Sequence, residues 1–330
     1  MFFHPSLILF LFLLLFSVVM MICMNSWFLI WFFIEMNLMS FIPLIMLKKS
    51  KYSAESALKY FFIQTLSSIL IVIGVLTLLT NMEIYILFFI MGLSIKLGLA
   101  PFHQWLVNIV EGLVWPLIGI LLTIQKVGPF ILFNYAYMMK ESSILAIFML
   151  SLLCAAVGAV GGLFTSSLRK IMVFSSVSHS AWMILGLIIS VNLWMIYFIF
   201  YSFILFSILY IFMNFYMSNL NHMFLKLNFI ITLSLGVNML SLGGLPPLSG
   251  FVPKFLMMME FVNFYSYFTL LYLLLSVFIS LFFYSRIFVL NFVFLSLKNM
   301  FLSQKSIKMS MGVYVNIMGL FIVPAMLYLY

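Results

Sequence analysis

Four ionisable side chains lie inside long apolar stretches of a chain in which only 6% of the 330 residues are charged. They are Glu35, Lys96, Lys126 and Lys254. An ionisable group within a membrane span costs at least about 2.5 kcal/mol on insertion scales, and it usually faces protein or water and serves transport. Burial disfavours the charged form of an amine, so a buried lysine can accept and release protons. The four residues therefore predict a proton- or ion-translocation axis.

The elements that position these residues are membrane-spanning helices. Hydrophobic residues make up 67% of the chain. Runs such as LILFLFLLLFSVVMMICM are apolar on every face and lack the alternation of a membrane β-barrel, so the fold class is an all-α polytopic membrane protein. Eleven spans are predicted from the apolar runs, at residues 6–24, 26–47, 53–79, 83–113, 116–138, 142–164, 169–190, 192–217, 228–262, 264–290 and 309–329.

Two of these spans are too long for one straight crossing, and both contain proline. The fourth is interrupted around Pro101, and the ninth around Pro246, Pro247 and Pro253. Proline removes a backbone donor and clashes with the preceding turn, so each helix should be broken at membrane depth and its freed carbonyls should find protein or water partners. Lys96 precedes the first break and Lys254 follows the second, which places both lysines beside opened backbone.

The two breaks occupy matching places in two blocks of five spans. Residues 1–138 form the first predicted block, and residues 139–290 form the second, which an odd number of spans per block inverts. Interrupted helices at matching positions of inverted repeats are typical of transporters, whose ion paths lie near the bilayer midplane. Residues 291–330 contain a basic loop and the last predicted span. The basic loops put the N-terminus on the matrix or cytoplasmic side and the C-terminus opposite.

Each candidate residue also has a structural interpretation, which stays open at this point. Glu35 could be a carboxylate that only pairs two helices, and Lys126 or Lys254 could extend to the interface. Three further residues are candidate relays, each with its own alternative. Lys59 lies one helical turn after Glu55 and fits an interfacial ion pair, His103 fits an interfacial histidine, and His179 fits a polar contact between helices.

Several function classes find no support in the chain. The cysteines Cys23 and Cys154 lie in separate predicted spans without a CxxC pattern, which argues against a disulfide framework and an iron–sulfur cluster. His4 and His222 lack metal-ligand spacing, so no metal site is expected. No nucleotide-binding motif occurs. The net charge of +9 indicates topology rather than a nucleic-acid partner, because no soluble basic surface is available.

Several sequence blocks resemble one family in order and spacing. They are NSWFLIWFFIEMNLMSFIPLI, KYFFIQT, LGLAPFHQWL, LLTIQKVGPF, LRKIMVFSSVSHSAWM and LSLGGLPPLSGFVPKF. Together they resemble the chain 2 family of NADH:ubiquinone oxidoreductase, the mitochondrially encoded antiporter-like subunits of respiratory complex I. The abundance of Phe and Met and the absence of Asp agree with an AT-rich organelle genome.

The resemblance implies a membrane-arm subunit that contributes to proton pumping in the mitochondrial inner membrane. NADH, FMN, iron–sulfur clusters and ubiquinone would be held by other subunits, and this chain would bind no cofactor itself. Its partners would be the other membrane-arm subunits and lipids, in an obligate hetero-oligomer. In the family's polar axis, Glu35 and Lys96 would form a coupled pair, Lys126 the connecting relay, and Lys254 the lysine at the second break.

One departure from the family and two alternative functions remain. Family members often read PFHxWxPE, whereas this chain has Val107 and Asn108 at the last two positions and Glu111 shortly afterwards, so no role is transferred to Glu111. An Mrp-type cation/proton antiporter subunit would share the same core. A structural spacer, whose buried charges only fix helix register, is the third interpretation.

Overall fold

A computed structural model describes residues 5–48, 50–79, 85–139, 141–220, 229–264 and 267–297. Helices account for nearly all of this part, and its β-structure is limited to an isolated bridge between Ser167 and Asn219. The all-α fold class is confirmed. Eight spans in the described ranges are long and apolar enough to cross a membrane, and Tyr85–Leu97 and Ile231–Gly243 are shorter apolar helices. The predicted span 309–329 lies outside the described residues.

The chain divides into two compact units, the first ending at Cys154 and the second beginning at Ala155. The first contains α1 (Pro5–Cys23), α2 (Trp27–Met46), α3 (Lys51–Leu79), α4 (Tyr85–Leu97), α5 (Gln104–Val110), α6 (Trp115–Leu122), α7 (Ile124–Met139) and the start of α8 (Glu141–Phe164). The second contains the rest of α8 with α9 (Leu168–Ile189), α10 (Val191–Asn214), α11 (Phe229–Gly243), α12 (Phe251–Phe264) and α13 (Tyr267–Leu297). The proposed repeat boundary at 138/139 stays a prediction.

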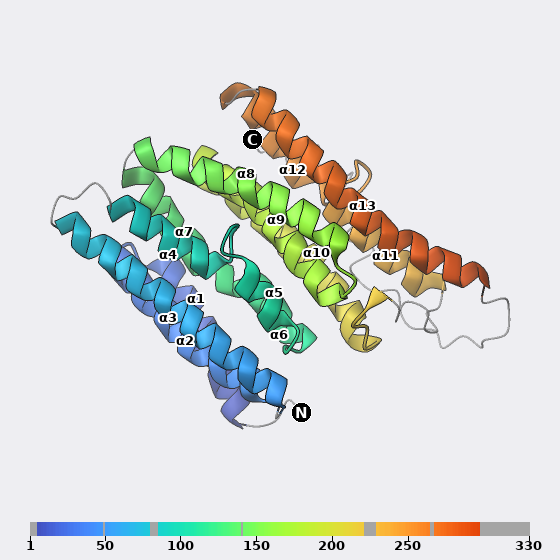
Figure 1. The fold of residues 1–330 in the computed structure, drawn as a ribbon, viewed down its shortest axis with the longest axis horizontal. Coiled ribbons are helices and arrows are strands. Elements are labelled where there is room, and N and C mark those ends of the chain that lie inside the picture. Colours follow the sequence, from blue (N-terminus) through green and yellow to red (C-terminus); the bar gives the residue numbers. More distant parts are fainter. Residues whose placement is uncertain are drawn as a thin grey trace. The chain divides into compact units, whose positions relative to one another are not determined.

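In the first unit, α1, α2 and α3 run side by side (Figure 1). Helix α4 packs on α3, and α7 packs on α2 and α4, so these four helices enclose a common interior. Apolar side chains fill that interior; Ile30, Phe41 and Leu93 are fully buried. The four helices therefore provide the largely apolar scaffold in which isolated polar side chains can be held.

In the second unit, α9 lies at the centre. In an 18-residue apolar stretch of α9, 94% of the residues are buried, and the helix packs against α10, α12 and α13. Helix α11 packs on α10 and α13. Arg286 of α13 donates from its guanidinium to the carbonyl oxygens of Leu163 (3.1 Å) and Thr165 (2.8 Å), which ties α13 to the end of α8.

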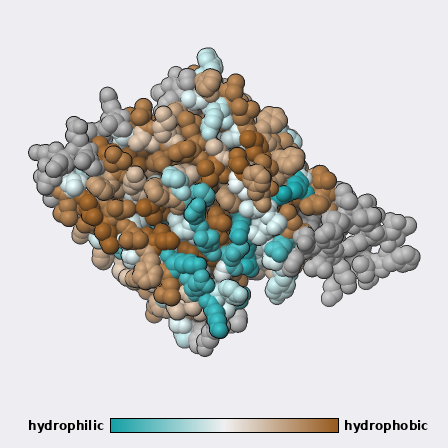
Figure 2. Space-filling view, viewed as in Figure 1, coloured by the Kyte–Doolittle hydropathy of each residue, from teal (hydrophilic) through white to brown (hydrophobic). Residues whose placement is uncertain are grey.

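The outer surface is largely apolar, as expected for helices that face lipid or partner subunits. In the view of Figure 2, hydrophobic side chains cover most of the described surface and hydrophilic ones occupy a smaller zone. Large exposed side chains such as Phe12, Phe62 and Phe278 point outward from their helices. The chain is thus a multi-pass membrane protein, with lysines such as Lys96, Lys126 and Lys254 buried among its helices.

Both predicted helix breaks occur. The fourth predicted span separates into α4 and α5 around Pro101, and the ninth into α11 and α12 around Pro246 and Pro247, whereas Pro253 is accommodated in the first turn of α12. The structure adds an interruption that the apolar run does not reveal: the fifth predicted span, 116–138, is α6 followed by α7, with non-helical backbone at Thr123.

Candidate functional site

Glu35 and Lys96 form an ion pair between α2 and the last turn of α4. The Nζ of Lys96 lies 2.6 Å from Oε1 of Glu35. The lysine side chain is 1% exposed and the glutamate side chain 22% exposed. A charge-assisted hydrogen bond of this length in a low-dielectric interior is strong, and neither charge is easily left alone there. The structure thus brings together the two residues for which the family resemblance implies a coupled pair.

The backbone that opens after Lys96 is satisfied by side chains from other elements. Trp105 of α5 donates its indole N–H to the Ile95 carbonyl oxygen at 3.0 Å. The Ala100 N–H donates to Sγ of Cys154 in α8 at 3.2 Å. Gly98, with φ 67°, makes the left-handed turn that ends α4, a conformation that L side chains disfavour. The first break is therefore held by side chains of other elements, an indole and a thiol among them, rather than by its lysine.

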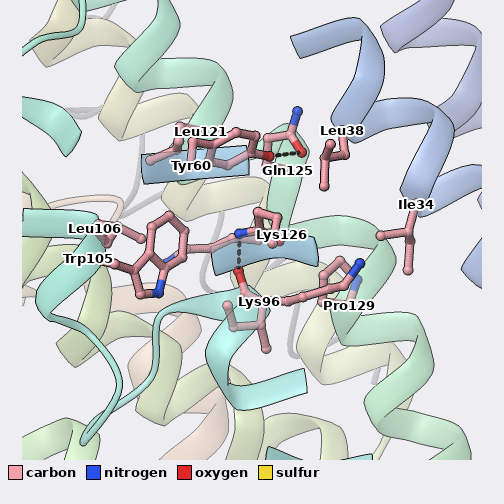
Figure 3. A pocket seen from close by; sticks show the side chains of 12 residues that line it. Ile34, Leu38, Tyr60, Lys96, Trp105, Leu106, Leu121, Gln125, Lys126 and Pro129 are labelled. Carbon is pink, nitrogen blue, oxygen red and sulfur yellow. Dashed lines mark hydrogen bonds between the residues drawn. The ribbon is translucent and has the colours of Figure 1, made fainter. Parts of the chain in front are cut away.

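Lys126 lies in the first turn of α7, directly after the interruption at Thr123, and is 2% exposed. It lines the same cavity as Lys96, together with Tyr60, Gln64 and Gln125 (Figure 3). Inside the cavity, the centre of a water molecule can move within a volume of about 20 Å³. This is enough room for one water molecule. Two buried amines and several hydrogen-bonding groups thus meet around a space of molecular size.

Four neutral polar residues were not singled out from the sequence: Tyr60, Gln64 and Gln125 line this cavity, and Asn37 binds Gln125. Gln125 donates from Nε2 to Oδ1 of Asn37 at 2.9 Å and accepts a hydrogen bond at Oε1 from the Tyr60 hydroxyl at 3.3 Å. Gln64 donates from Nε2 to the Lys96 carbonyl oxygen at 3.4 Å. A usable signal was present, because a carboxamide within an otherwise apolar span needs partners just as a charge does.

Lys254 occupies the second break, in the second unit, and is 3% exposed. Its Nζ donates to the carbonyl oxygens of Leu242 (3.2 Å) and Gly243 (2.8 Å), the last residues of α11. The side chain lies against Gly244, whose φ of 81° ends that helix. An ammonium group at a helix C-terminus meets both the orphan carbonyls and the negative end of the helix dipole. Lys254 therefore joins the two halves of the broken helix.

His179 lies beside this break. Its Nδ1 is 2.8 Å from the Tyr197 hydroxyl, and its ring lies 5.0 Å from that of Tyr201. All three residues line a small cavity with Ser241 of α11 and Pro253 of α12. The imidazole is 6% exposed and can exchange roles as donor or acceptor with Tyr197. The polar contact between helices that the sequence allowed is present, and it faces the broken helix.

The remaining candidates lie apart from the two cavities. Lys59 pairs with Glu55 at 2.5 Å, and both side chains are about half exposed, so the ion pair predicted from their spacing is formed. His103 is half-buried in the turn before α5. Where the family often has Pro and Glu, α5 continues as helix through Val107 and Asn108 to Val110. His4 and His222 lie outside the described residues.

The likeness to known proteins covers most of the chain. The family model described as NADH:quinone oxidoreductase/Mrp antiporter, TM, matches residues 24–280. NADH-ubiquinone oxidoreductase chain 2 of Anopheles gambiae is 37% identical over 299 residues, 86% of each protein. The chain 2 protein of Nyctophilus arnhemensis is 42% identical over 276 residues, 80% of this chain and 79% of that protein. The chain belongs to the NADH-ubiquinone oxidoreductase chain 2 family.

Solved structures agree with this chain 2 fold. A chain of respiratory complex I from Thermus thermophilus superimposes with a TM-score of 0.80 at 18% identity, covering 98% of this chain and 78% of that one. A chain of the Mrp complex from Dietzia gives a TM-score of 0.72 at 15% identity, covering 92% of this chain and 62% of that one. The antiporter-like fold is therefore common to both assemblies, and the family assignment rests on the more similar chain 2 sequences.

Proposed function

We propose that this chain is a membrane-arm subunit of a proton-pumping NADH:ubiquinone oxidoreductase and that its buried lysines carry protons. The observation that carries the proposal is the cavity shared by Lys96 and Lys126, with Lys96 held by Glu35 at 2.6 Å. A structural spacer would need no water-sized space between two buried amines. The chain 2 relatives are named as parts of an NADH-ubiquinone oxidoreductase. In this proposal, the redox reaction of the other subunits supplies the energy for proton transport.

The proton step uses only groups of the first unit. When Lys96 is an ammonium and Lys126 a neutral amine, a water in the cavity accepts a proton from Lys96 while it gives one to Lys126. The positive charge moves from one lysine to the other and no charge is created. Glu35 controls the step, because its carboxylate stabilises the charged form of Lys96. Before Lys96 releases its proton, either the ion pair must be weakened or the carboxylate must be protonated.

Lys254 is the corresponding proton-carrying lysine in the second unit. Its ammonium is held by backbone carbonyls rather than by a carboxylate, and His179 lies at a cavity lined by Leu242, one of the residues whose carbonyl binds Lys254. His179 and Tyr197 can pass a proton between them, which supports His179 as a relay. His103 at the first break and Lys59 on α3 remain candidate relays with weaker support, since neither lines the cavity of Lys96 and Lys126.

The rest of the proposal concerns the assembly. The chain performs no redox chemistry, and NADH, FMN, iron–sulfur clusters and ubiquinone bind to other subunits of the hetero-oligomer. It lies in the mitochondrial inner membrane among lipids and other membrane-arm subunits, with its N-terminus in the matrix and its C-terminus in the intermembrane space. The basic loops and the names of the relatives support this placement. An Mrp-type antiporter subunit is the alternative, supported by the shared fold and by a family model whose description names both kinds of protein.

The test is to replace Lys126 by Met in the assembled complex and to measure protons translocated per NADH oxidised in sealed vesicles. We expect the ratio to fall while the amount of assembled complex and NADH oxidation with an artificial acceptor stay unchanged. Glu35→Gln should lower the same ratio. Lys51→Met, which removes an exposed lysine of α3, is the matched control. A wild-type ratio in assembled Lys126→Met complex would exclude the lysine axis.

A further inference from the structure

The carboxamide of Gln125 connects three helices next to Lys126. Gln125 lies in the first turn of α7, its Nε2 donates to Asn37 of α2, and its Oε1 accepts from Tyr60 of α3. Figure 3 shows the bond between Tyr60 and Gln125, two of the residues that line the cavity with Lys126. One side chain therefore fixes the start of α7 against two helices of the same unit, and one of those helices carries Glu35.

The run of regular helical hydrogen bonds is interrupted at this point, although the Thr123 N–H still bonds to the Gly119 carbonyl at 3.1 Å. Helix α6 ends at Leu122, and Thr123 has φ −121° and ψ −80°, outside the helical region. The Lys126 N–H bonds to the Thr123 carbonyl at 2.9 Å, a shorter-range bond than that of a regular α-helix. Pro129 lacks the N–H that would otherwise bond the Gln125 carbonyl. The direction in which α7 starts, and with it the direction of Lys126, therefore depends on ties to neighbouring helices.

The two partners of Gln125 are placed to provide those ties. Asn37 is 3% exposed and Tyr60 is 2% exposed, so bulk water cannot replace either contact. Hydrogen bonds in such an environment are strong, and a group left without its partner is correspondingly unfavourable. Loss of the Gln125 carboxamide would leave Asn37 and Tyr60 to find other partners, and the helix start would move to supply them.

We infer that Gln125 is a positioning residue that holds Lys126 against the cavity it shares with Lys96. The inference rests on the proposed function, because it explains what holds Lys126 at the right distance from Lys96 for the proposed proton transfer. Gln125 does not itself exchange the proton. Proton transfer depends steeply on geometry, and a misplacement of ~1 Å in a reacting group can reduce a rate by about a hundredfold.

The experiment replaces Gln125 by Leu in the full complex, which keeps side-chain bulk and removes both hydrogen bonds. We expect protons translocated per NADH oxidised to fall to the level of the Lys126→Met complex, with NADH oxidation by an artificial acceptor and the amount of complex unchanged. The matched control is Gln104→Leu, which removes an exposed carboxamide of α5 and should pump like the wild type. A residue with a purely structural role would change the amount of complex and leave the ratio alone.

The pH profile of the ratio supplies a second readout. The titratable groups around Lys126 are Lys96 of α4, the Tyr60 hydroxyl of α3, Glu35 of α2 through its pairing with Lys96, and the Cys154 thiol of α8 within electrostatic reach. If Gln125 sets the distance between the two lysines, its loss should move the pH midpoint of pumping. A structural loss would lower the whole profile without moving it.

Tyr60→Phe keeps the inference testable if Gln125→Leu fails to assemble. It removes only the hydroxyl that binds Gln125, so we expect a smaller fall in the ratio and a displaced midpoint in the same direction. A wild-type ratio and midpoint in this variant, or in assembled Gln125→Leu, would overturn the inference. If Lys126→Met also pumped normally, the proposed function itself would fail, so the two failures are distinguishable.

Discussion

The two helix breaks share a backbone turn but differ in what their lysines hold. Gly98 and Gly244 have φ of 67° and 81°, and a proline follows each of them, Pro101 in the first break and Pro247 in the second. At the first break the ammonium of the lysine binds a carboxylate from another helix. At the second it binds the carbonyl ends of the helix that has just stopped. The same kind of turn therefore occurs with two different partners for the lysine ammonium, a carboxylate and backbone carbonyls.

The difference concerns which part of the structure responds when a lysine changes charge. The ammonium of Lys96 binds Glu35, while an indole, a carboxamide and the thiol of Cys154 bond to the opened backbone. A change at Lys96 therefore acts first on the ion pair. Lys254 donates to Leu242 and Gly243, so a change in its charge acts on the junction of the two half-helices. The first break is a place of charge pairing, and the second couples charge to backbone conformation.

The largest effect should come from separating the ion pair at the first break. Lys96→Met leaves Glu35 without its counter-charge, which should destabilise the subunit by about 3 kcal/mol, the lower end for a buried pair because the glutamate is partly exposed. The double variant Lys96→Met with Glu35→Gln should recover most of that stability, since no charge is left unpaired. Proton pumping through this subunit should be lost in both the single and the double variant. Thermal inactivation of the complex and the proton-to-NADH ratio give the two readouts.

Lys254→Met is the comparison for this experiment. Its stability should not improve when Glu35→Gln is added, because the groups left without a donor are carbonyls of α11. If Glu35→Gln restored both lysine variants equally, or restored neither, the contrast between the two breaks would be wrong.

The fold and the breaks were predictable from the sequence because both depend on local chemistry. Apolar runs specify membrane helices, and Pro101 and Pro247 disrupt them whatever lies nearby. The buried lysines were visible for the same reason, as charges in an apolar run. The interruption at Thr123 was not visible, because it has no proline or glycine of its own and is stabilised by its hydroxyl, which donates to the Gly119 carbonyl oxygen at 2.7 Å.

The partners of the polar residues could not be derived from local sequence. Gln125 bonds to Asn37 and Tyr60, far away along the chain, and the periodicity of an apolar span does not show which of its faces will meet another helix. The bond of Lys254 to α11 needed the three-dimensional turn at Gly244. The pairing of Glu35 with Lys96 came from family resemblance and not from spacing. Tertiary geometry decided each of these contacts.

A smaller effect should distinguish the two turns themselves. Alanine at Gly244 or Gly98 forces a left-handed conformation on an L side chain, which should destabilise each variant by about 1 to 2 kcal/mol. The added Cβ at Gly244 would lie 2.7 Å from Cδ of Lys254, whereas at Gly98 it would lie 2.8 Å from Cδ1 of Leu106. We therefore expect similar losses of thermal stability but a lowered proton-to-NADH ratio in Gly244→Ala only. An equal loss of pumping in Gly98→Ala would mean that the turn matters, not the lysine.

The smallest effect concerns the thiol that satisfies the first break. Cys154→Val removes the acceptor of the Ala100 N–H and should reduce stability by about 1 kcal/mol, and Cys154→Ser, which keeps an acceptor, should change it less. The control is Cys23→Val, which alters an exposed cysteine. The proton-to-NADH ratio should stay at the wild-type value in all three variants, because the ammonium of Lys96 is held by Glu35 and not by this part of the backbone. A stable Cys154→Val complex with a reduced ratio would show that the first break, like the second, is coupled to its lysine.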